Sequence, residues 1–135
     1  MARMNLVLDT SVVIAVVTNE PHKERLVGST MGADLIAPST LPAEIGNAFS
    51  VMFKQKRIGL KQALAAIQAF QRIPIRLSEI DLARGLELAD ELGVYAYDAY
   101  VIGCALKHRC PLISLDGGLI AAARRAGAQI VEAEP

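Results

Sequence analysis

The sequence predicts a single α/β domain with a parallel central sheet of about five strands and helices on both faces. Short apolar runs that suit buried strands alternate with longer stretches in which apolar residues recur at helical spacing. Hydrophobic residues make up 53% of the chain and aromatic residues only 4%, so the core must be mostly aliphatic, as in helix-covered parallel sheets. The length of 135 residues matches one ordinary domain, and we expect residues 1–135 to form one unit.

Five short apolar runs are predicted to be the strands of this sheet. Each run is bounded by residues that favour turns or helix starts, and Pro74 opens the third. Because helical segments join the runs, we expect the strands to lie parallel. The predicted strands span residues 5–8, 35–37, 75–77, 112–115 and 129–131.

Seven helices are predicted from the spacing of apolar residues and from capping signals. Thr10 and Ser11 are good caps for the first helix, and Gly93 follows the fifth, where a left-handed residue is common. Gly59 separates the third helix from the fourth, and Pro111 ends the sixth. The predicted helices span residues 11–18, 21–27, 41–56, 60–71, 81–92, 97–107 and 117–126.

Charge and cysteine content narrow the classes of function. The 14 basic and 14 acidic residues give a formal net charge of zero, so binding to nucleic acid would need a local basic patch. Cys104 and Cys110 lack the spacing of a zinc site, and we expect two free thiols, which fits a reducing cytoplasm. No apolar run reaches about 18 residues, so no membrane span is expected.

Four acidic residues fall where a predicted strand gives way to a helix or where a helix begins. They are Asp9, Glu44, Asp98 and Asp116. Each alone is most simply a helix cap or a first-turn acid. Independent caps have no reason to gather at one edge of a sheet, however, and the carboxyl ends of parallel strands form one edge. Clustered carboxylates repel unless a hard cation such as Mg²⁺ or Mn²⁺ neutralises them. The pattern therefore indicates metal-assisted chemistry on a phosphate.

The segments that carry these acids resemble the motifs of PIN-domain ribonucleases, particularly the VapC toxins of prokaryotic toxin–antitoxin modules. The resemblance runs nearly the whole length of the chain, in the order and spacing of four short motifs. They are Leu-Val-Leu-Asp-Thr-Ser at Asp9, Glu-Ile-Gly-Asn-Ala-Phe from Glu44, Tyr-Asp-Ala-Tyr at Asp98 and Leu-Ile-Ser-Leu-Asp ending at Asp116. The pair Gly117-Gly118 departs from the charged pair that is more typical of the last motif.

The resemblance implies a metal-dependent endoribonuclease, the toxin of a type II toxin–antitoxin pair, that hydrolyses RNA with a metal-activated water. Asp9 and Asp98 would bind Mg²⁺ or Mn²⁺ directly, while Glu44 would bind a second metal or position water. Asp116 would act through water. Four residues would contact phosphate or support the ligands: Thr10, Ser11, Asn47 and Ser114. A cognate antitoxin, a homodimer and a cytoplasmic location are also implied.

Other phosphate enzymes and a non-catalytic role are the alternatives. A dehalogenase-type phosphatase needs a second Asp two residues after the first, where Ser11 stands. A receiver domain needs a central phosphoacceptor Asp, and none lies between Asp34 and Asp81. A catalytically weak PIN-like RNA-binding or regulatory module, or another Mg²⁺-dependent phosphate hydrolase, remains the alternative interpretation.

Several surface features have two interpretations. Basic clusters at 54–61, 107–109 and 124–125 suit an RNA backbone, but solvated helix ends explain them at least as well. The face formed by Phe49, Met52 and Phe53 suits the core first and an antitoxin surface second. The three tyrosines are suited to stacking on bases, but packing near the site is favoured; they are Tyr95, Tyr97 and Tyr100.

Overall fold

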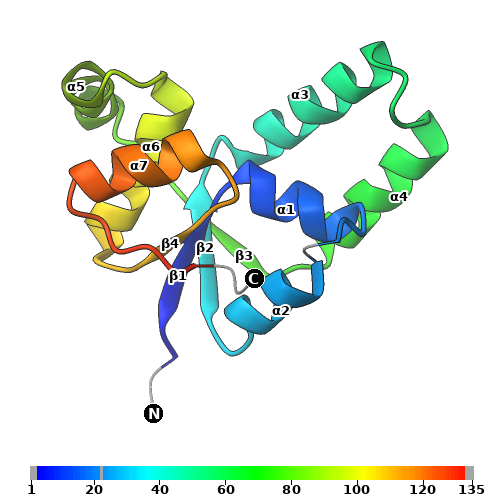
Figure 1. Ribbon diagram of the computed structural model, residues 1–135, viewed down its shortest axis with the longest axis horizontal. Coiled ribbons are helices and arrows are strands. Elements are labelled where there is room, and N and C mark those ends of the chain that lie inside the picture. The colour runs from blue at the N-terminus through cyan, green and yellow to red at the C-terminus, as the bar shows by residue number, and fades with distance from the viewer. Residues whose placement is uncertain (1–2, 22, 133–135) are drawn as a thin grey trace.

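One parallel sheet forms the centre of the computed structural model, which describes residues 3–21 and 23–132 (Figure 1). The strands are β1 (Asn5–Leu8), β2 (Asp34–Pro38), β3 (Ile75–Ser78) and β4 (Leu112–Ile113). Their order across the sheet is β3-β2-β1-β4, and all neighbouring pairs are parallel. In the register, Val7 of β1 lies between Ile36 of β2 and Leu112 of β4. β1 is therefore an interior strand of the sheet, and it leads directly into Asp9.

The fifth predicted strand is reduced to a single parallel bridge between Leu112 and Ile130. The Leu112 N–H donates to the Gln129 carbonyl at 2.9 Å, and the Val131 N–H donates to the Leu112 carbonyl at 2.9 Å. β4 is also shorter than the predicted 112–115, because the Leu115 N–H donates to the Ser11 hydroxyl instead of a neighbouring strand. The expectation of about five strands is thus met by four strands and one bridge.

All seven predicted helices are present, with shifted ends. They are α1 (Thr10–Val17), α2 (Lys23–Thr30), α3 (Leu41–Lys54), α4 (Leu60–Gln71), α5 (Leu82–Leu92), α6 (Ala96–His108) and α7 (Gly117–Arg125). The largest difference is in α2, where Gly28 lies inside the helix although it is predicted to end it. Its end is instead stabilised by Thr30, whose hydroxyl donates to the Leu26 carbonyl at 2.9 Å. Residue 22, within the predicted second helix, lies outside the described residues.

Two hydrophobic clusters, one on each face of the sheet, form the core. Leu6 and Leu8 point to one face and Val7 points to the other, as the alternation of a strand requires. Helices α1–α4 pack on the face with Leu6 and Leu8, and α5–α7 pack on the opposite face (Figure 1). The predicted covering of both faces by helices is therefore confirmed.

Both cysteines are free thiols, as predicted. Cys104 is buried in the cluster under α5–α7, and this burial raises the pKa of its thiol to about 11. The thiol is therefore protonated at neutral pH and behaves as a small apolar group. No helix within the described residues is long and apolar enough to cross a bilayer.

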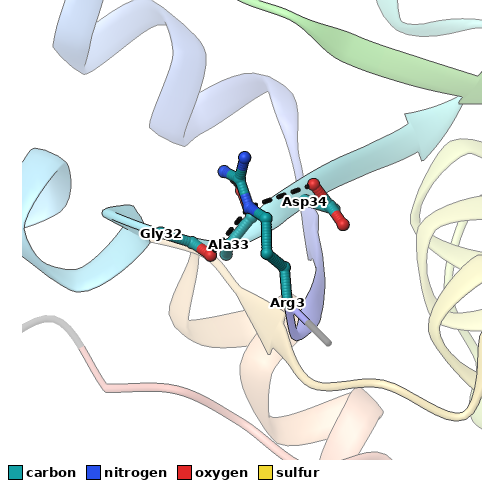
Figure 2. A network of polar contacts seen from close by, with 4 residues as sticks. All are labelled: Arg3, Gly32, Ala33 and Asp34. Atoms are coloured by element: carbon teal, nitrogen blue, oxygen red, sulfur yellow. Dashed lines mark hydrogen bonds and ion pairs between the residues drawn. The ribbon is translucent and has the colours of Figure 1, made fainter. Parts of the chain in front are cut away.

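The amino end of the sheet is fastened by Arg3 (Figure 2). Its guanidinium donates to the carbonyls of Gly32 and Ala33 at 3.1 and 3.0 Å. It also forms an ion pair with Asp34 at 3.3 Å, in which both side chains are more than half exposed. Exposed pairs of this kind stabilise a fold little, so the contacts mainly define where β1 and β2 begin.

Candidate functional site

The four predicted acids lie toward the carboxyl edge of the sheet. Asp9 follows β1 and Asp116 follows the β4 segment, while Glu44 and Asp98 occupy the first turns of α3 and α6. Helices α1, α3 and α7 begin close to this edge (Figure 1). In open parallel sheets, the crevice at this edge is the usual place for a ligand.

Asp9 is the most deeply buried of these acids, with 7% of its surface exposed. One carboxylate oxygen, Oδ1, accepts from the Ser11 hydroxyl at 2.7 Å and from the Val12 N–H at 3.3 Å. The other, Oδ2, accepts from the Ser114 hydroxyl at 2.7 Å. Asp9 is therefore both the N-cap of α1 and a side chain fixed from two segments of the chain.

Ser11 and Ser114 connect α1 to the turn before α7. The Ser11 hydroxyl accepts from the Leu115 N–H at 3.0 Å, and the Ser114 hydroxyl accepts from the Asp116 N–H at 3.0 Å. Each serine thus donates to Asp9 and accepts from a backbone amide near Asp116. Across the described ranges, every buried polar side-chain atom has a hydrogen-bond partner, so this network is complete.

Glu44 is half-buried and is held by two threonines. Its Oε1 atom accepts from the Thr10 hydroxyl at 3.3 Å, and its Oε2 atom accepts from the Thr40 hydroxyl at 2.8 Å. Thr40 occupies the N-cap position of α3, but its side chain makes no capping bond and supports Glu44 instead. The signal for this role is its position four residues before Glu44, one helical turn away.

Asp98 and Asp116 are less constrained than Asp9. Asp98 is half-buried, and its carboxylate accepts no hydrogen bond from the described residues. Asp116 is exposed and caps α7, because its Oδ1 atom accepts from the N–H groups of Gly118 and Leu119 at 2.9 and 3.2 Å. A Cβ atom at Gly118 would lie 3.3 Å from this oxygen, which gives a local reason for glycine there.

Asn47 is a predicted site residue that makes no hydrogen bond with any of the four acids among the described residues. It lies on the exposed side of α3, one turn after Glu44. Its carbonyl accepts from the Ser50 hydroxyl at 2.7 Å, and its side-chain amide makes no hydrogen bond with the described residues. In this arrangement Asn47 is free to meet a molecule at the surface, but it does not position any of the four acids.

The carboxylates are linked by mutual repulsion. Loss of hydration through burial is the main cause that raises the pKa of Asp9, Glu44 and Asp98. The charge of Asp116 raises the pKa of Asp9 and Asp98 further, and the charges of Asp9 and Asp98 raise that of Glu44. None of the ion pairs between described residues involves these acids, so no basic side chain offsets the repulsion.

The donor set suits a hard divalent cation, but the ligands are not assembled around one point. Carboxylate oxygens are preferred by Mg²⁺ and Mn²⁺, and each retains a lone pair beyond the hydrogen bonds described above. Among the residues that the structure describes, no three Asp, Glu, His or Cys side chains are placed closely enough to hold one ion. The acids are thus electrostatic neighbours, but as placed in the described residues they do not form a three-ligand site.

Comparison with protein families identifies the PIN domain, whose family model matches residues 6–125. Comparison with curated protein sequences gives no match. The family match covers most of the chain and includes all four acids.

Solved structures with the same architecture come from several organisms. PAE2754 from Pyrobaculum aerophilum is 21% identical with a TM-score of 0.72, and the alignment covers 95% of this chain and 84% of that one. FitAcB from Neisseria gonorrhoeae is 18% identical with a TM-score of 0.65, covering 94% and 96%. Mycobacterium tuberculosis VapC20, a toxin that cleaves the sarcin–ricin loop, is 15% identical with a TM-score of 0.63, covering 87% and 94%. At these identities the likeness shows a shared fold.

Proposed function

This chain belongs to the PIN-domain family, and we propose that it is a metal-dependent endoribonuclease acting as the toxin of a type II toxin–antitoxin pair. PIN domains are generally nucleases, which supports phosphodiester hydrolysis. The similarity to VapC20, a toxin that cleaves the sarcin–ricin loop, supports RNA as the substrate class. The free cysteines are consistent with the cytoplasmic location that this role needs.

The observation that carries the proposal is the group of mutually repelling acids at the carboxyl edge of the sheet. Asp9, Glu44 and Asp98 have raised pKa values, and each feels the charge of at least one other acid of the site. A fold that needed these residues only as helix caps would have no reason to bring their charges together. A bound divalent cation relieves the repulsion, so the arrangement favours a metal site.

The proposed roles follow from how each acid is held. Asp9 and Asp98 would ligate the ion, Glu44 would bind a second ion or orient water, and Asp116 would act through water. A bound Mg²⁺ or Mn²⁺ supplies an activated water and neutralises charge on the phosphate. Ser11 and Ser114 fix the carboxylate of Asp9, so one ligand is oriented before the substrate arrives.

The antitoxin is proposed to occupy a groove between α1, α3 and α4. The groove has a volume of about 710 Å³, and its apolar lining includes Val16, Met52 and Ile58. Phe49 is buried, as expected of a core residue, but Phe53 of the same helix is 38% exposed. An apolar segment of a partner chain suits this surface. A homodimer is a further proposal and rests on the family resemblance alone.

The proposed function is tested by RNA cleavage with Mn²⁺ or Mg²⁺ on structured and single-stranded substrates, with EDTA as a control. We expect metal-dependent cleavage that falls roughly 100-fold or more in Asp98→Asn, because electrostatic stabilisation of the reacting phosphate is lost. Asp34→Asn is the matched control, since Asp34 lies at the opposite end of the sheet. Cleavage that survives EDTA, or that is equal in Asp98→Asn and wild type, would contradict the proposal.

One observation favours the regulatory module as a second candidate. The described acids do not form a three-ligand group as they are placed, and a module that binds RNA without cutting it would not need one. Calorimetric titration with Mn²⁺ or Mg²⁺ separates the two candidates. No metal binding and no cleavage by folded protein would favour the module, whereas metal binding together with cleavage would exclude it.

A further inference from the structure

Two tyrosines at the start of α6 expose large aromatic surfaces beside the candidate site. Tyr95 is 88% exposed and Tyr97 is 53% exposed. Tyrosine side chains are usually at least partly buried, because the ring carries much apolar surface that folding removes from water. The expectation that these tyrosines pack near the site is therefore wrong for Tyr95, and the position needs another explanation.

The ring of Tyr97 packs against a second tyrosine of α6. It meets the Tyr100 ring edge to face, with centroids 6.1 Å apart and an interplanar angle of 77°. Tyr100 in turn fills the space over Gly85 of α5, where an added Cβ atom would lie 2.7 Å from the Tyr100 ring. Tyr97 thus packs against Tyr100 on one side, while about half of its surface stays open to solvent.

Tyr95 and Tyr97 lie at the same end of α6 as Asp98. Tyr95 is the N-cap residue of α6, and Tyr97 immediately precedes Asp98 in its first turn. The charge of Asp116 reaches Asp98, so this turn faces the candidate site. Tyr95 precedes Asp98 by three residues, which is one helical turn, so an RNA phosphate at Asp98 would lie about one turn from Tyr95.

A positive charge from α7, that of Arg125, contacts the end of α5 just before the segment that leads to Tyr95. The Arg125 guanidinium donates to the Leu92 carbonyl at 3.0 Å, three residues before Tyr95, and has no acidic partner among the described residues. Aromatic rings combined with a cation that follows the backbone are the usual means of holding single-stranded nucleic acid. A purely apolar protein contact would not use the cation.

We propose that Tyr95 and Tyr97 form a stacking platform for unpaired bases of the RNA next to the phosphate that is cut. The proposal rests on the proposed ribonuclease function and adds the side chains that would hold the bases of its substrate. Bases inside a helix are already stacked on one another, and only unpaired bases can meet a protein ring face to face. Arg125 contributes charge to the backbone of the same segment.

The test measures binding rather than cleavage, with EDTA present so that no metal-dependent cleavage occurs. A labelled single-stranded RNA is compared with an abasic strand of equal length, which keeps the phosphates and lacks the bases. We expect Tyr95→Ala to weaken RNA binding by about 5-fold or more and to leave binding of the abasic strand unchanged. Tyr95→Phe keeps the ring and is expected to bind both strands like wild type.

Arg125→Gln is the control for backbone contact and is expected to weaken both strands alike. Because Tyr95 is almost fully exposed, its replacement should leave thermal unfolding unchanged. The platform is overturned if wild type binds no RNA, if Tyr95→Ala binds RNA as tightly as wild type, or if it weakens both strands equally. A change in oligomeric mass in Tyr95→Ala would overturn it too, since the ring would then cover a second copy.

This experiment separates failure of the platform from failure of the nuclease. Cleavage by wild type, with Tyr95→Ala still binding RNA normally, would overturn the platform alone. A different result would overturn the nuclease and support the platform. In that result, wild type binds RNA through its bases but cleaves no RNA with metal, and Tyr95→Ala loses the base-dependent binding.

Discussion

A single buried hydroxyl, that of Ser114, joins two of the four acids. It donates to the Asp9 carboxylate at 2.7 Å and accepts from the Asp116 N–H at 3.0 Å. Ser114 is 4% exposed, so neither partner can readily exchange it for water. The orientation of Asp9 relative to the turn at Asp116 therefore depends on this hydroxyl together with that of Ser11, which joins Asp9 to the Leu115 N–H.

Replacing Ser114 tests this dependence. We expect Ser114→Ala to lower the free energy of unfolding by about 1–3 kcal/mol, because it leaves buried polar groups without a partner. Denaturant unfolding measures the change. Ser50→Ala is the matched control, since its hydroxyl bonds an exposed helix carbonyl at 2.7 Å and its loss should cost less than about 0.5 kcal/mol. Equal losses of unfolding free energy in the two variants would show that the buried network stabilises the fold no more than an exposed hydrogen bond does.

The sequence locates the acids better than it locates their supports. Asp9 and Asp116 are predictable because short apolar strands end just before them. The bond from Ser114 to Asp9 spans 105 positions, and local patterns carry no information about such contacts. The hydrogen bond from Thr40 to Glu44 is missed because helix capping explains a threonine at that position equally well. The exposure of Tyr95 is missed because the sequence does not show which side chains cover a ring.

At the level of elements, the close approach of α5 and α6 depends on Gly85. The residue is buried in α5, and the Tyr100 ring of α6 occupies the space where a side chain would begin. Helical spacing predicts both helices but does not predict this contact, because a glycine within a helix is usually only a cost in stability. The Tyr100 ring that fills this space also meets the Tyr97 ring edge to face.

A pair of glycine substitutions tests this packing. Gly85→Ala is expected to lower the free energy of unfolding by about 1–3 kcal/mol, because its Cβ would overlap the Tyr100 ring. Gly46→Ala in α3 is expected to raise it by up to about 1 kcal/mol, because nothing lies within 4 Å and alanine favours the helix. Thermal or denaturant unfolding gives both values. A rise in stability for Gly85→Ala as well would mean that the overlap is relieved without strain, and a loss for Gly46→Ala would contradict the open space around that glycine.

The limits of sequence reasoning about elements have one physical cause. The number and order of helices follow from apolar spacing, which is local. The ends of β4 and α2 do not follow from apolar spacing. The Leu115 N–H donates to the hydroxyl of Ser11, 104 residues away, and the Thr30 hydroxyl stabilises the last turn of α2, beyond Gly28. Tertiary contacts override weak local preferences at such positions.

In the whole molecule, stability and the candidate site occupy different places. The two clusters on the faces of the sheet bury the aliphatic side chains, while the four acids gather at one edge. The net charge of zero conceals this uneven distribution, which is why composition alone gives no sign of it. Parallel topology is the link, because it directs every strand toward the same edge.

The pH dependence of stability should reveal this edge in protein without metal. The pKa of Asp98 is raised above its usual value of 3.8, so the folded state holds this proton more tightly than the unfolded chain does. The resulting stabilisation is complete below the usual pKa and is lost as pH rises through the raised value. Asp98→Asn removes the ionising group, so in EDTA its stability relative to wild type should increase with pH through this window.

Measuring thermal unfolding of wild type and Asp98→Asn from about pH 3 to pH 8 tests this expectation and also reports metal binding. Other carboxylates titrate in both proteins, so only the difference between the two is assigned to Asp98. Near neutral pH in EDTA we expect the variant to be the more stable of the two, as is common when a functional charge is removed. Mn²⁺ should then stabilise wild type more than the variant, because binding to the folded state raises stability by mass action. A difference that shrinks as pH rises would contradict the raised pKa, and equal stabilisation by Mn²⁺ would remove Asp98 from the ligands.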